Sequence, residues 1–185
     1  MAEVKRTYYP SGELKSEVFL LNGKKNGIYK EYHSNGQLWK IVVYIDDKLN
    51  GEYKSYHPNG QLGGICSYVD DKLHGEYKSY YEDGSELSSD NSTDSFGQLE
   101  IICTYVDDKL NGEYKEYYAN GQLQITSSFI DNKYHGEYKK YHENGGQLEE
   151  SCSYIDGNEN GEYKTYDENG ELIEKCYYDN GIKVE

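Results

Sequence analysis

An internal repeat is the feature that most constrains the fold of this chain. A Gly-x-Tyr-Lys segment recurs along almost the whole sequence of 185 residues. Its two clearest copies open units of 24 residues, GEYKSYHPNGQLGGICSYVDDKLH from Gly51 and GEYKEYYANGQLQITSSFIDNKYH from Gly112. A fixed period of about 20 to 50 residues is typical of folds built by stacking similar units. We therefore expect an array of units in place of one compact core.

The repeat predicts a single domain over residues 1–185, in which a half copy precedes six units. Their boundaries are 6–26 for the half copy and then 27–50, 51–74, 75–111, 112–135, 136–160 and 161–185. The third unit is lengthened by Ser85 to Gly97, which we expect to be a disordered excursion at a hairpin tip because it is rich in Ser and Asp. An extra glycine at Gly145-Gly146 predicts a bulge or a lengthened turn.

Each unit contains two runs rich in tyrosine and other strand formers, and this pattern predicts a β-hairpin. Asn-Gly recurs between the runs, at Asn35, Asn59, Asn120, Asn144 and Asn169. It predicts a two-residue type I′ turn, in which both residues have positive φ. We accordingly expect an all-β fold, an elongated, twisted, single-layer antiparallel β-meander built from tandem hairpins.

The turns also predict the strand register. A turn at Asn59-Gly60 would pair His57 with Leu62, Ser55 with Gly64, Tyr53 with Cys66 and Gly51 with Tyr68. A second turn at Asp70-Asp71 would pair Tyr68 with Leu73 and Cys66 with Gly75. Both turns place the same residues on one face, because side chains alternate along a strand. The opposite face, which carries Glu52, Lys54 and Tyr56, is expected to be largely polar.

On the apolar face, equivalent residues form columns. One column is Leu14, Leu38, Leu62, Leu99, Leu123, Leu148 and Leu172. A second holds small residues, Val18, Val42, Cys66, Cys103, Ser127, Cys152 and Cys176. A third is Leu20, Tyr44, Tyr68, Tyr105, Phe129, Tyr154 and Tyr178, and a fourth is Tyr29, Tyr53, Tyr77, Tyr114, Tyr138 and Tyr163. We expect the glycine that opens each unit to make room for a ring of the third column.

Tyrosine provides a large contact area at low entropic cost, so these columns are the candidate partner-binding face. The candidate residues are Tyr53, Tyr68, Tyr77, Tyr105, Tyr114, Phe129, Tyr138, Tyr154 and Tyr163. Equivalent cysteines lie two strands apart, about 9 to 10 Å, whereas a disulfide needs Cα atoms within about 7 Å. The four cysteines are therefore predicted to be free thiols that fill space.

Charge limits the classes of partner. With 34 acidic and 19 basic residues, the formal charge is -15, which opposes binding to nucleic acid and makes a membrane surface an unfavourable partner. No apolar run reaches the roughly 20 residues needed to span a bilayer, and no signal-peptide stretch follows the N-terminus. We expect a cytoplasmic protein or, alternatively, a virion component, with a protein partner or a second copy of itself.

Catalysis, cofactors and metals are not expected. The histidines fall at two repeat positions, His33, His57 and His142 and then His74 and His135, which places them a repeat apart and not around one ion. Acidic pairs such as Asp70-Asp71 lack EF-hand spacing and suit turns, with weak cation binding as the alternative. No nucleophile, zinc or phosphate-loop motif occurs.

The unit YxxYxxNGQLxxxxxYxDxKLxGEY resembles the MORN repeat, in the variant found in bacterial antitoxin-like proteins and in large DNA viruses. The resemblance extends from Tyr8 to about Gly181. It implies a twisted single-layer sheet and a role in protein association or scaffolding. Three functions follow: a non-enzymatic scaffold, a structural subunit of a large assembly such as a virion, or an antitoxin-like protein that neutralises a toxin.

Overall fold

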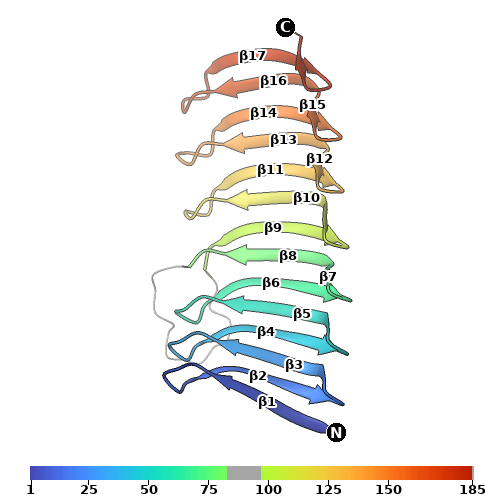
Figure 1. The fold of residues 1–185 in the computed structure, drawn as a ribbon. Helices are drawn as coiled ribbons and strands as arrows, with labels where there is room; N and C mark the ends of the chain where they lie inside the picture. The colour runs from blue at the N-terminus through green and yellow to red at the C-terminus, as the bar shows by residue number, and fades with distance from the viewer. Residues whose placement is uncertain (83–96, 185) are drawn as a thin grey trace. The chain divides into compact units, whose positions relative to one another are not determined.

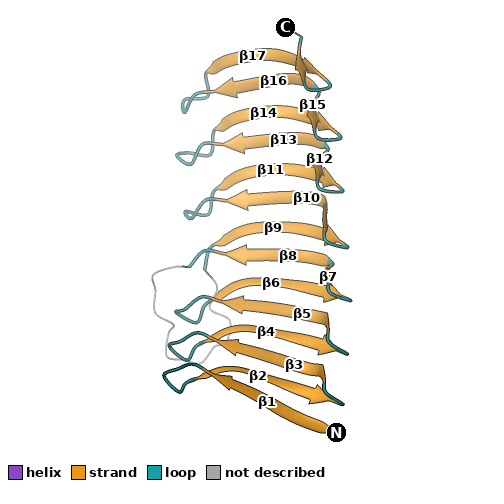
Figure 2. Cartoon of the chain, in the orientation of Figure 1, coloured by secondary structure: helices purple, strands orange, loops and turns teal. Residues whose placement is uncertain are grey.

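The structure is a computed structural model, and it describes residues 1–82 and 97–184. All regular structure in these residues is β-strand (Figure 2). By their internal contacts, the residues divide into two compact units, Met1–Gln98 and Leu99–Glu185. Each unit is an antiparallel sheet in which strands that follow one another in the sequence lie side by side (Figure 1). The predicted all-β meander of hairpins is confirmed, and the single domain over residues 1–185 stays a prediction.

The first unit contains eight strands in chain order. They are β1 (Ala2–Tyr8), β2 (Leu14–Leu21), β3 (Lys24–Tyr32), β4 (Leu38–Ile45), β5 (Lys48–Tyr56), β6 (Leu62–Val69), β7 (Lys72–Leu73) and β8 (Gly75–Tyr80). Both β7 and β8 pair with β6, because they are two parts of one strand interrupted at His74.

The second unit repeats this arrangement with ten strands. They are β9 (Leu99–Val106), β10 (Lys109–Tyr117), β11 (Leu123–Ile130), β12 (Lys133–Tyr134), β13 (Gly136–Tyr141), β14 (Leu148–Ile155), β15 (Asn158–Glu159), β16 (Gly161–Tyr166), β17 (Leu172–Asp179) and β18 (Ile182–Lys183). The pairs β12 and β13 on β11, and β15 and β16 on β14, are again single strands with an interruption.

The turns at Asn-Gly are not the predicted type I′ turns. At the first turn of the second repeat, Gly60 has φ of 88°, but Asn59 is not among the residues with positive φ. The His57 carbonyl accepts from Gly60 N–H, and His57 N–H donates to the Gln61 carbonyl. This is a three-residue loop, a type I turn followed by a left-handed glycine. The predicted pair of His57 with Leu62 is wrong, because Tyr56 pairs with Leu62 and the extra residue Gly63 then restores the register.

The type I′ geometry occurs at the acidic turns. Asp70 and Asp71 have φ of 49° and 69°, and Tyr68 pairs with Leu73 across them as predicted. The predicted pairs of Gly51 with Tyr68, Tyr53 with Cys66 and Ser55 with Gly64 are also confirmed. Aspartate tolerates the left-handed region better than most residues, which explains its use at these tips.

The strands contain a bulge at the glycine that opens each repeat, and because of it a second expected pair is wrong. Ile65 pairs with Lys78, so Cys66 does not lie opposite Gly75. Gly75 has φ of 99°, and a Cβ added there would meet no atom within 4 Å. Room for a neighbouring ring is therefore not the reason for this glycine. The bulge requires a backbone conformation that only glycine adopts without strain.

The two departures from the period both fall in first turns. His142 N–H donates to the carbonyl of Gln147, one residue further along than in the other repeats, which confirms a lengthened turn at Gly145-Gly146. Tyr81 N–H donates to the carbonyl of Gln98 at 2.9 Å, where the second repeat has the bond from His57 to Gln61. The predicted disordered excursion at residues 85–97 lies, apart from Gly97, outside the described residues.

The column of small residues is the core of each sheet. Its members are between 2% and 8% exposed: Val18, Val42 and Cys66 in the first unit and Cys103, Ser127, Cys152 and Cys176 in the second. A single layer has no second sheet to cover it, so the long side chains on adjacent strands do so. All four cysteines are free and buried, as predicted. Burial raises the pKa of the thiols of Cys66, Cys103 and Cys152 to about 11.

Candidate protein-binding surface

Rows of aromatic rings flank the buried column in the first unit. Tyr53 pairs with Val42 on one side and with Cys66 on the other, so its ring stands between two small residues. Its ring meets that of Tyr68 edge to face, with centroids 5.9 Å apart. Tyr29 and Tyr44 form the same contact one repeat earlier, at 6.0 Å. The rings thus cover the buried column of the sheet, and their edges remain exposed to solvent.

The same pairs recur in the second unit, where the rings form a larger cluster. Tyr114 meets Phe129 at 5.7 Å, and Tyr163 meets Tyr178 at 5.8 Å. Tyr134 occupies a position that is leucine in Leu49, Leu73 and Leu110. Its ring lies 4.4 Å from that of Phe129, 5.0 Å from Tyr154 and 5.7 Å from Tyr138. Tyr134 therefore joins neighbouring ring pairs into one continuous aromatic surface.

The predicted binding-face residues are half-buried without exception. They are Tyr53, Tyr68 and Tyr77 in the first unit and Tyr105, Tyr114, Phe129, Tyr138, Tyr154 and Tyr163 in the second. Within each unit the pairing register places them on one face. Their role in binding stays a prediction, whereas their role as the cover of the core is visible in the packing.

Burial governs the acid–base behaviour of these rings. It raises the pKa of Tyr53, and it raises the pKa of Tyr163 to about 12. The pKa values of Tyr138 and Tyr154 are also raised, first by burial and further by nearby carboxylates such as Glu150. The phenols therefore remain neutral over the physiological range and act as hydrogen-bonding, apolar surfaces.

In the first unit, lysines of the chain itself cover the rings. The Lys25 Nζ lies 4.6 Å from the ring centroid of Tyr44 and 5.4 Å from that of Tyr29. The Lys40 Nζ lies 5.8 Å from the Tyr29 centroid and forms an ion pair of 3.0 Å with Glu31. Glu31 in turn accepts the Tyr29 hydroxyl at 2.8 Å. Cations and carboxylates thus satisfy one another within this part of the face.

In the second unit, the same face also has lysines, but other glutamates bind them, as Glu174 binds Lys183 beside Tyr178 at 2.8 Å. Glu150 and Glu159 are half-buried, and neither side-chain carboxylate forms an ion pair or hydrogen bond within the part of the chain that the structure describes. Lys140, which pairs with Glu150 across the ladder, is held by Glu149 at 2.6 Å. Burial raises the pKa of Glu150, Lys140 opposes this effect, and Glu149 and Glu159 add to it. This surface therefore has an excess of negative charge beside the rings.

The histidines near the first turns connect successive repeats. The Nε2 atoms of His33, His57 and His142 lie 2.8, 2.9 and 3.0 Å from the backbone carbonyls of Tyr56, Tyr80 and Tyr166. In the second unit the Tyr118 hydroxyl makes the same contact with the carbonyl of Tyr141, at 2.8 Å. Because a phenol substitutes for the imidazole, this position serves to join repeats. No group of three or more metal-binding side chains is present in residues 1–82 and 97–184.

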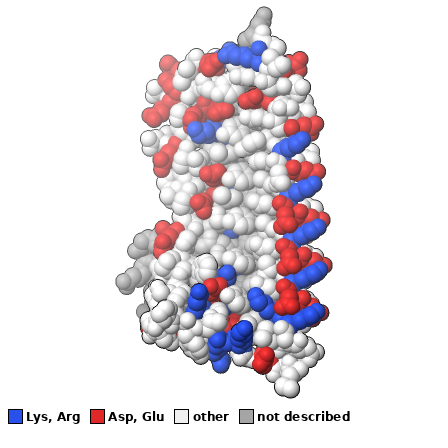
Figure 3. Space-filling model, in the orientation of Figure 1, with Lys and Arg blue, Asp and Glu red and all other residues white. Residues whose placement is uncertain are grey.

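The acidic turn tips connect repeats in a similar way. Asp71 N–H donates to the carbonyl of Leu49, and Leu49 N–H donates to Oδ1 of Asp71 at 2.7 Å. Lys48 forms an ion pair of 3.5 Å with Asp70. Acidic and basic side chains accordingly alternate along this edge (Figure 3). These carboxylates bind backbone and lysine groups of the neighbouring turn, which makes structural support their first role.

The opposite face is less polar than predicted. Residues that precede the acidic turns, and Leu21 before the equivalent Asn22-Gly23 turn, form a row of aliphatic side chains that are 41% to 52% exposed: Leu21, Ile45 and Val69 in the first unit and Val106, Ile130 and Ile155 in the second. Beside this row, Glu and Lys of the GEYK segment pair along each strand, as in Glu113 with Lys115 at 3.2 Å. The sequence contained a signal for this row: successive side chains alternate between faces, so Val69 lies on the face opposite to Tyr68.

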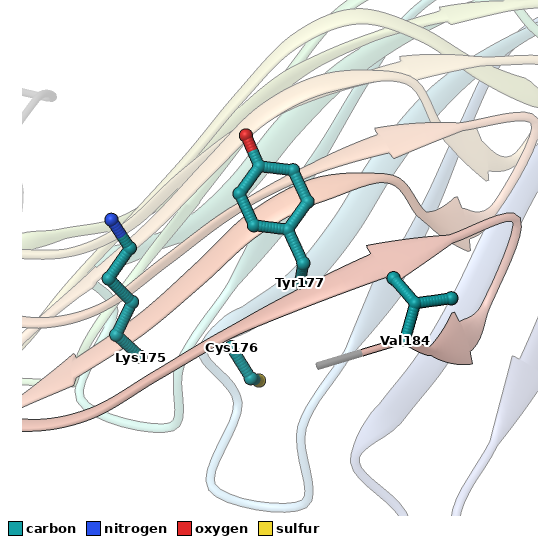
Figure 4. Close-up of a pocket in the computed structure, with 4 residues that line it drawn as sticks. All are labelled: Lys175, Cys176, Tyr177 and Val184. Carbon is teal, nitrogen blue, oxygen red and sulfur yellow. The ribbon is translucent and has the colours of Figure 1, made fainter.

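A hollow of about 640 Å³ is present at β17, lined by Lys175, Cys176, Tyr177 and Val184. Figure 4 shows Cys176 pointing from one side of the strand and Lys175 and Tyr177 from the other. Because these side chains diverge, they do not converge on a ligand. The aromatic face is therefore the stronger candidate site.

Comparison with known proteins agrees with the repeat and the fold. The profile of the MORN repeat variant matches seven segments, 4–22, 25–46, 49–70, 73–85, 110–131, 134–156 and 159–180. Most of these matches span one hairpin of the sheet. No curated protein matches the chain. Among the described residues, no helix has the length and apolar character needed to cross a membrane. The chain belongs to the MORN repeat family, a fold that is typically non-catalytic and whose repeats generally serve in binding to proteins or membranes.

Proposed function

We propose that this protein is a non-enzymatic scaffold that binds a protein partner through the tyrosine-rich face of its sheets. The observation that carries the proposal is the continuous aromatic surface around Tyr134, Tyr138 and Tyr154, with ring centroids 5.0 to 6.0 Å apart. Half-buried tyrosines are rigid, and they combine a large apolar area with a hydroxyl. These properties make tyrosine common at sites that dominate binding energy.

Charge favours a protein over the other macromolecules. The formal charge of -15 repels nucleic acid and anionic lipid. A protein partner with a neutral or basic surface faces no such barrier, and long-range attraction would accelerate its association. The aromatic face has the composition of an interface, whereas the opposite face places its exposed aliphatic row beside paired Glu–Lys rows.

The test is an affinity pull-down from native lysate with matched variants of the second unit. One variant, Tyr114→Ser with Tyr138→Ser, alters the aromatic face. The control, Val106→Ser with Ile130→Ser, removes exposed aliphatic side chains from the opposite face, which are 43% and 50% exposed. Circular dichroism and thermal unfolding first establish that both variants are folded.

We expect a stoichiometric partner to be recovered with the wild type and the control but not with the tyrosine variant. Equal recovery with all three proteins would contradict the proposal and reduce the tyrosines to core residues. Loss of the partner with the control variant alone would show that the aliphatic row is the binding site.

A further inference from the structure

The second unit has two half-buried carboxylates beside the densest group of rings. Glu159 pairs directly with Tyr154 across the ladder between β14 and β15. Glu150 lies on β14 four residues before Tyr154 and, by strand alternation, projects from the same face. We name Tyr134, Tyr138, Tyr154, Glu150 and Glu159 the acidic ring cluster. Its carboxylates have no ion-pair partner among the described residues. Lys140, directly opposite Glu150 on the adjacent strand, is bound to Glu149 and compensates the charge of Glu150 only in part.

The negative charge of these two carboxylates is not fully compensated by the chain. A partly desolvated carboxylate is costly unless a cation or hydrogen-bond donors compensate its charge. Burial raises the pKa of Glu150, and Glu149 and Glu159 add to this effect, which Lys140 offsets only in part. The two carboxylates also raise the pKa of Tyr154, after the larger effect of burial. A cation at this position would stabilise both carboxylates and contact the negative face of the rings at the same time.

The first unit shows that the repeat accommodates a cation at the equivalent position. Glu159 lies two residues before Gly161, as Lys25 lies two residues before Gly27. The Lys25 Nζ rests 4.6 and 5.4 Å from the centroids of Tyr44 and Tyr29. The rings equivalent to these are Tyr178 and Tyr163, whose centroids are 5.8 Å apart. Tyr178 and Tyr163 lie outside the acidic ring cluster, but Glu159 belongs to it and, after the larger effect of desolvation, also raises the pKa of Tyr178. The ring geometry that holds a lysine in the first unit therefore recurs next to the cluster, with the Glu159 carboxylate where the lysine would be.

We propose that the acidic ring cluster binds an arginine side chain from a basic peptide segment of the partner. This inference rests on the proposed function and specifies the chemistry of the partner. A guanidinium stacks flat on a tyrosine ring and simultaneously donates in-plane hydrogen bonds to carboxylates on its rim. An ammonium group lacks the planar surface for stacking, so arginine exceeds lysine as a ligand.

The test is titration of the purified full chain with synthetic peptides by isothermal titration calorimetry. The probe is a Gly-Ser peptide of about ten residues with three arginines, and the reference peptides carry lysine or uncharged citrulline in their place. The site variant is Glu150→Gln with Glu159→Gln. The matched control is Glu113→Gln with Glu137→Gln, which removes the same charge from exposed carboxylates on the opposite face, 79% and 76% exposed.

We expect the site variant to weaken binding of the arginine peptide by at least about tenfold, which corresponds to about 1.4 kcal/mol. The control should change the affinity by less than about twofold, since exposed pairs contribute little. The citrulline peptide should not bind. Equal weakening by both variants would show attraction by net charge alone and would overturn the proposal, as would a wild type that binds no arginine peptide.

Failure of this inference is distinguishable from failure of the scaffold proposal. The lysate pull-down is repeated with the Glu150→Gln, Glu159→Gln protein. If it recovers the partner that the tyrosine variant loses, the aromatic face binds the partner and the arginine contact is wrong. If the tyrosine variant retains every partner, the scaffold proposal fails irrespective of the peptide titration.

Discussion

The two units share one repeat but differ in how they neutralise their aromatic faces. In the first unit, Lys25 and Lys40 lie over the rings, and Glu31 is paired with Lys40. In the second, Glu150 and Glu159 stand beside the rings outside any ion pair among the described residues, because Lys140 and Lys183 are bound to Glu149 and Glu174. Apart from the lengthened turn at Gly145-Gly146 and the added ring of Tyr134, the strand pairing, turns and ring pairs are equivalent in both. A few variable positions between conserved structural columns therefore decide whether the face satisfies itself or is left with charge for a partner to satisfy.

The two units also differ in the residues of their buried column. In the first unit it is Val18, Val42 and Cys66, and in the second it contains three thiols and Ser127. The Ser127 hydroxyl is the one buried side-chain oxygen or nitrogen without a hydrogen-bond partner in the part of the chain that the structure describes. The second unit thus combines a less apolar core with a less neutral face.

Alkaline pH should produce the largest difference between the units. Folding raises the pKa of Cys103 and Cys152 from 9.0 to about 11 and that of Tyr163 from 10.0 to about 12. Stability from a raised pKa is complete below the unfolded value and is lost as pH rises towards the folded value. We expect stability to decline from pH 9 upwards. The first unit also has a thiol and a phenol with a raised pKa, Cys66 and Tyr29, but its column contains Val18 and Val42 where the second unit has two thiols with a raised pKa, so we expect the second unit to open first.

Two probes separate the units in this experiment. Fluorescence of Trp39, the only tryptophan, reports on the first unit, and hydrogen exchange resolved by mass spectrometry reports on β9 to β17. Constant protection of both units up to pH 11 would contradict the expectation, as would earlier opening of the first unit.

Transfer of serine into the core of the first unit should have the next largest effect. Val42→Ser removes buried methyl groups at a residue that is 2% exposed and adds a hydroxyl without a partner, at a cost of about 3 kcal/mol. Urea denaturation measures the loss. Ile28→Ser is the control, because Ile28 is 52% exposed, and it should stay within about 0.5 kcal/mol of the wild type.

The reverse change should stabilise the second unit. Ser127→Val removes the unpaired hydroxyl and restores the residue of the first unit, for a gain of about 1 kcal/mol. Ser127→Cys changes the volume less and should give a smaller gain in the same urea experiment. A loss of stability in both variants would show that the site cannot hold a larger side chain and that the hydroxyl has an undetected role.

Glu159→Lys should have the smallest effect on stability but a decisive effect on binding. It introduces at the equivalent position the lysine that covers the rings of the first unit, for a gain of about 0.5 kcal/mol. It should also abolish binding of the arginine peptide, because the site then contains its own cation. Thermal unfolding and calorimetry measure the two effects. If the variant still bound the arginine peptide and its stability were unchanged, the residue at position 159 would not account for the difference between the units.

Strand order, faces and columns were predictable because alternation and the repeat impose them many times over. Turn chemistry was not, because Asn-Gly alone does not specify whether both residues have positive φ. The Asn59 side chain accepts the Gln61 N–H, which suits the longer loop. The error was confined to the turn, since Gly63 restores the register. The pair of Cys66 with Gly75 failed because the sequence does not show where a glycine bulge inserts residues.

The candidate face was predicted only as columns of rings. Which of its charges are paired could not be predicted, because this depends on side-chain distances. Lys40 lies close to the Tyr29 ring, whereas Lys140 is bound to Glu149. Tyr134 interrupts a leucine position, and that irregularity was the available signal for the larger cluster. The tip aspartates were assigned to turns, but their bonds to the preceding repeat required the three-dimensional register.

Hydroxyl-radical footprinting of the protein with and without its captured partner tests the central claim most directly, because it labels aromatic and aliphatic side chains on both faces at once. We expect the partner to protect Tyr138 and Tyr154 and to leave Ile130 and Ile155, on the opposite face, as reactive as in the free protein. Protection of Ile130 and Ile155 with unchanged labelling of the tyrosines would contradict the claim.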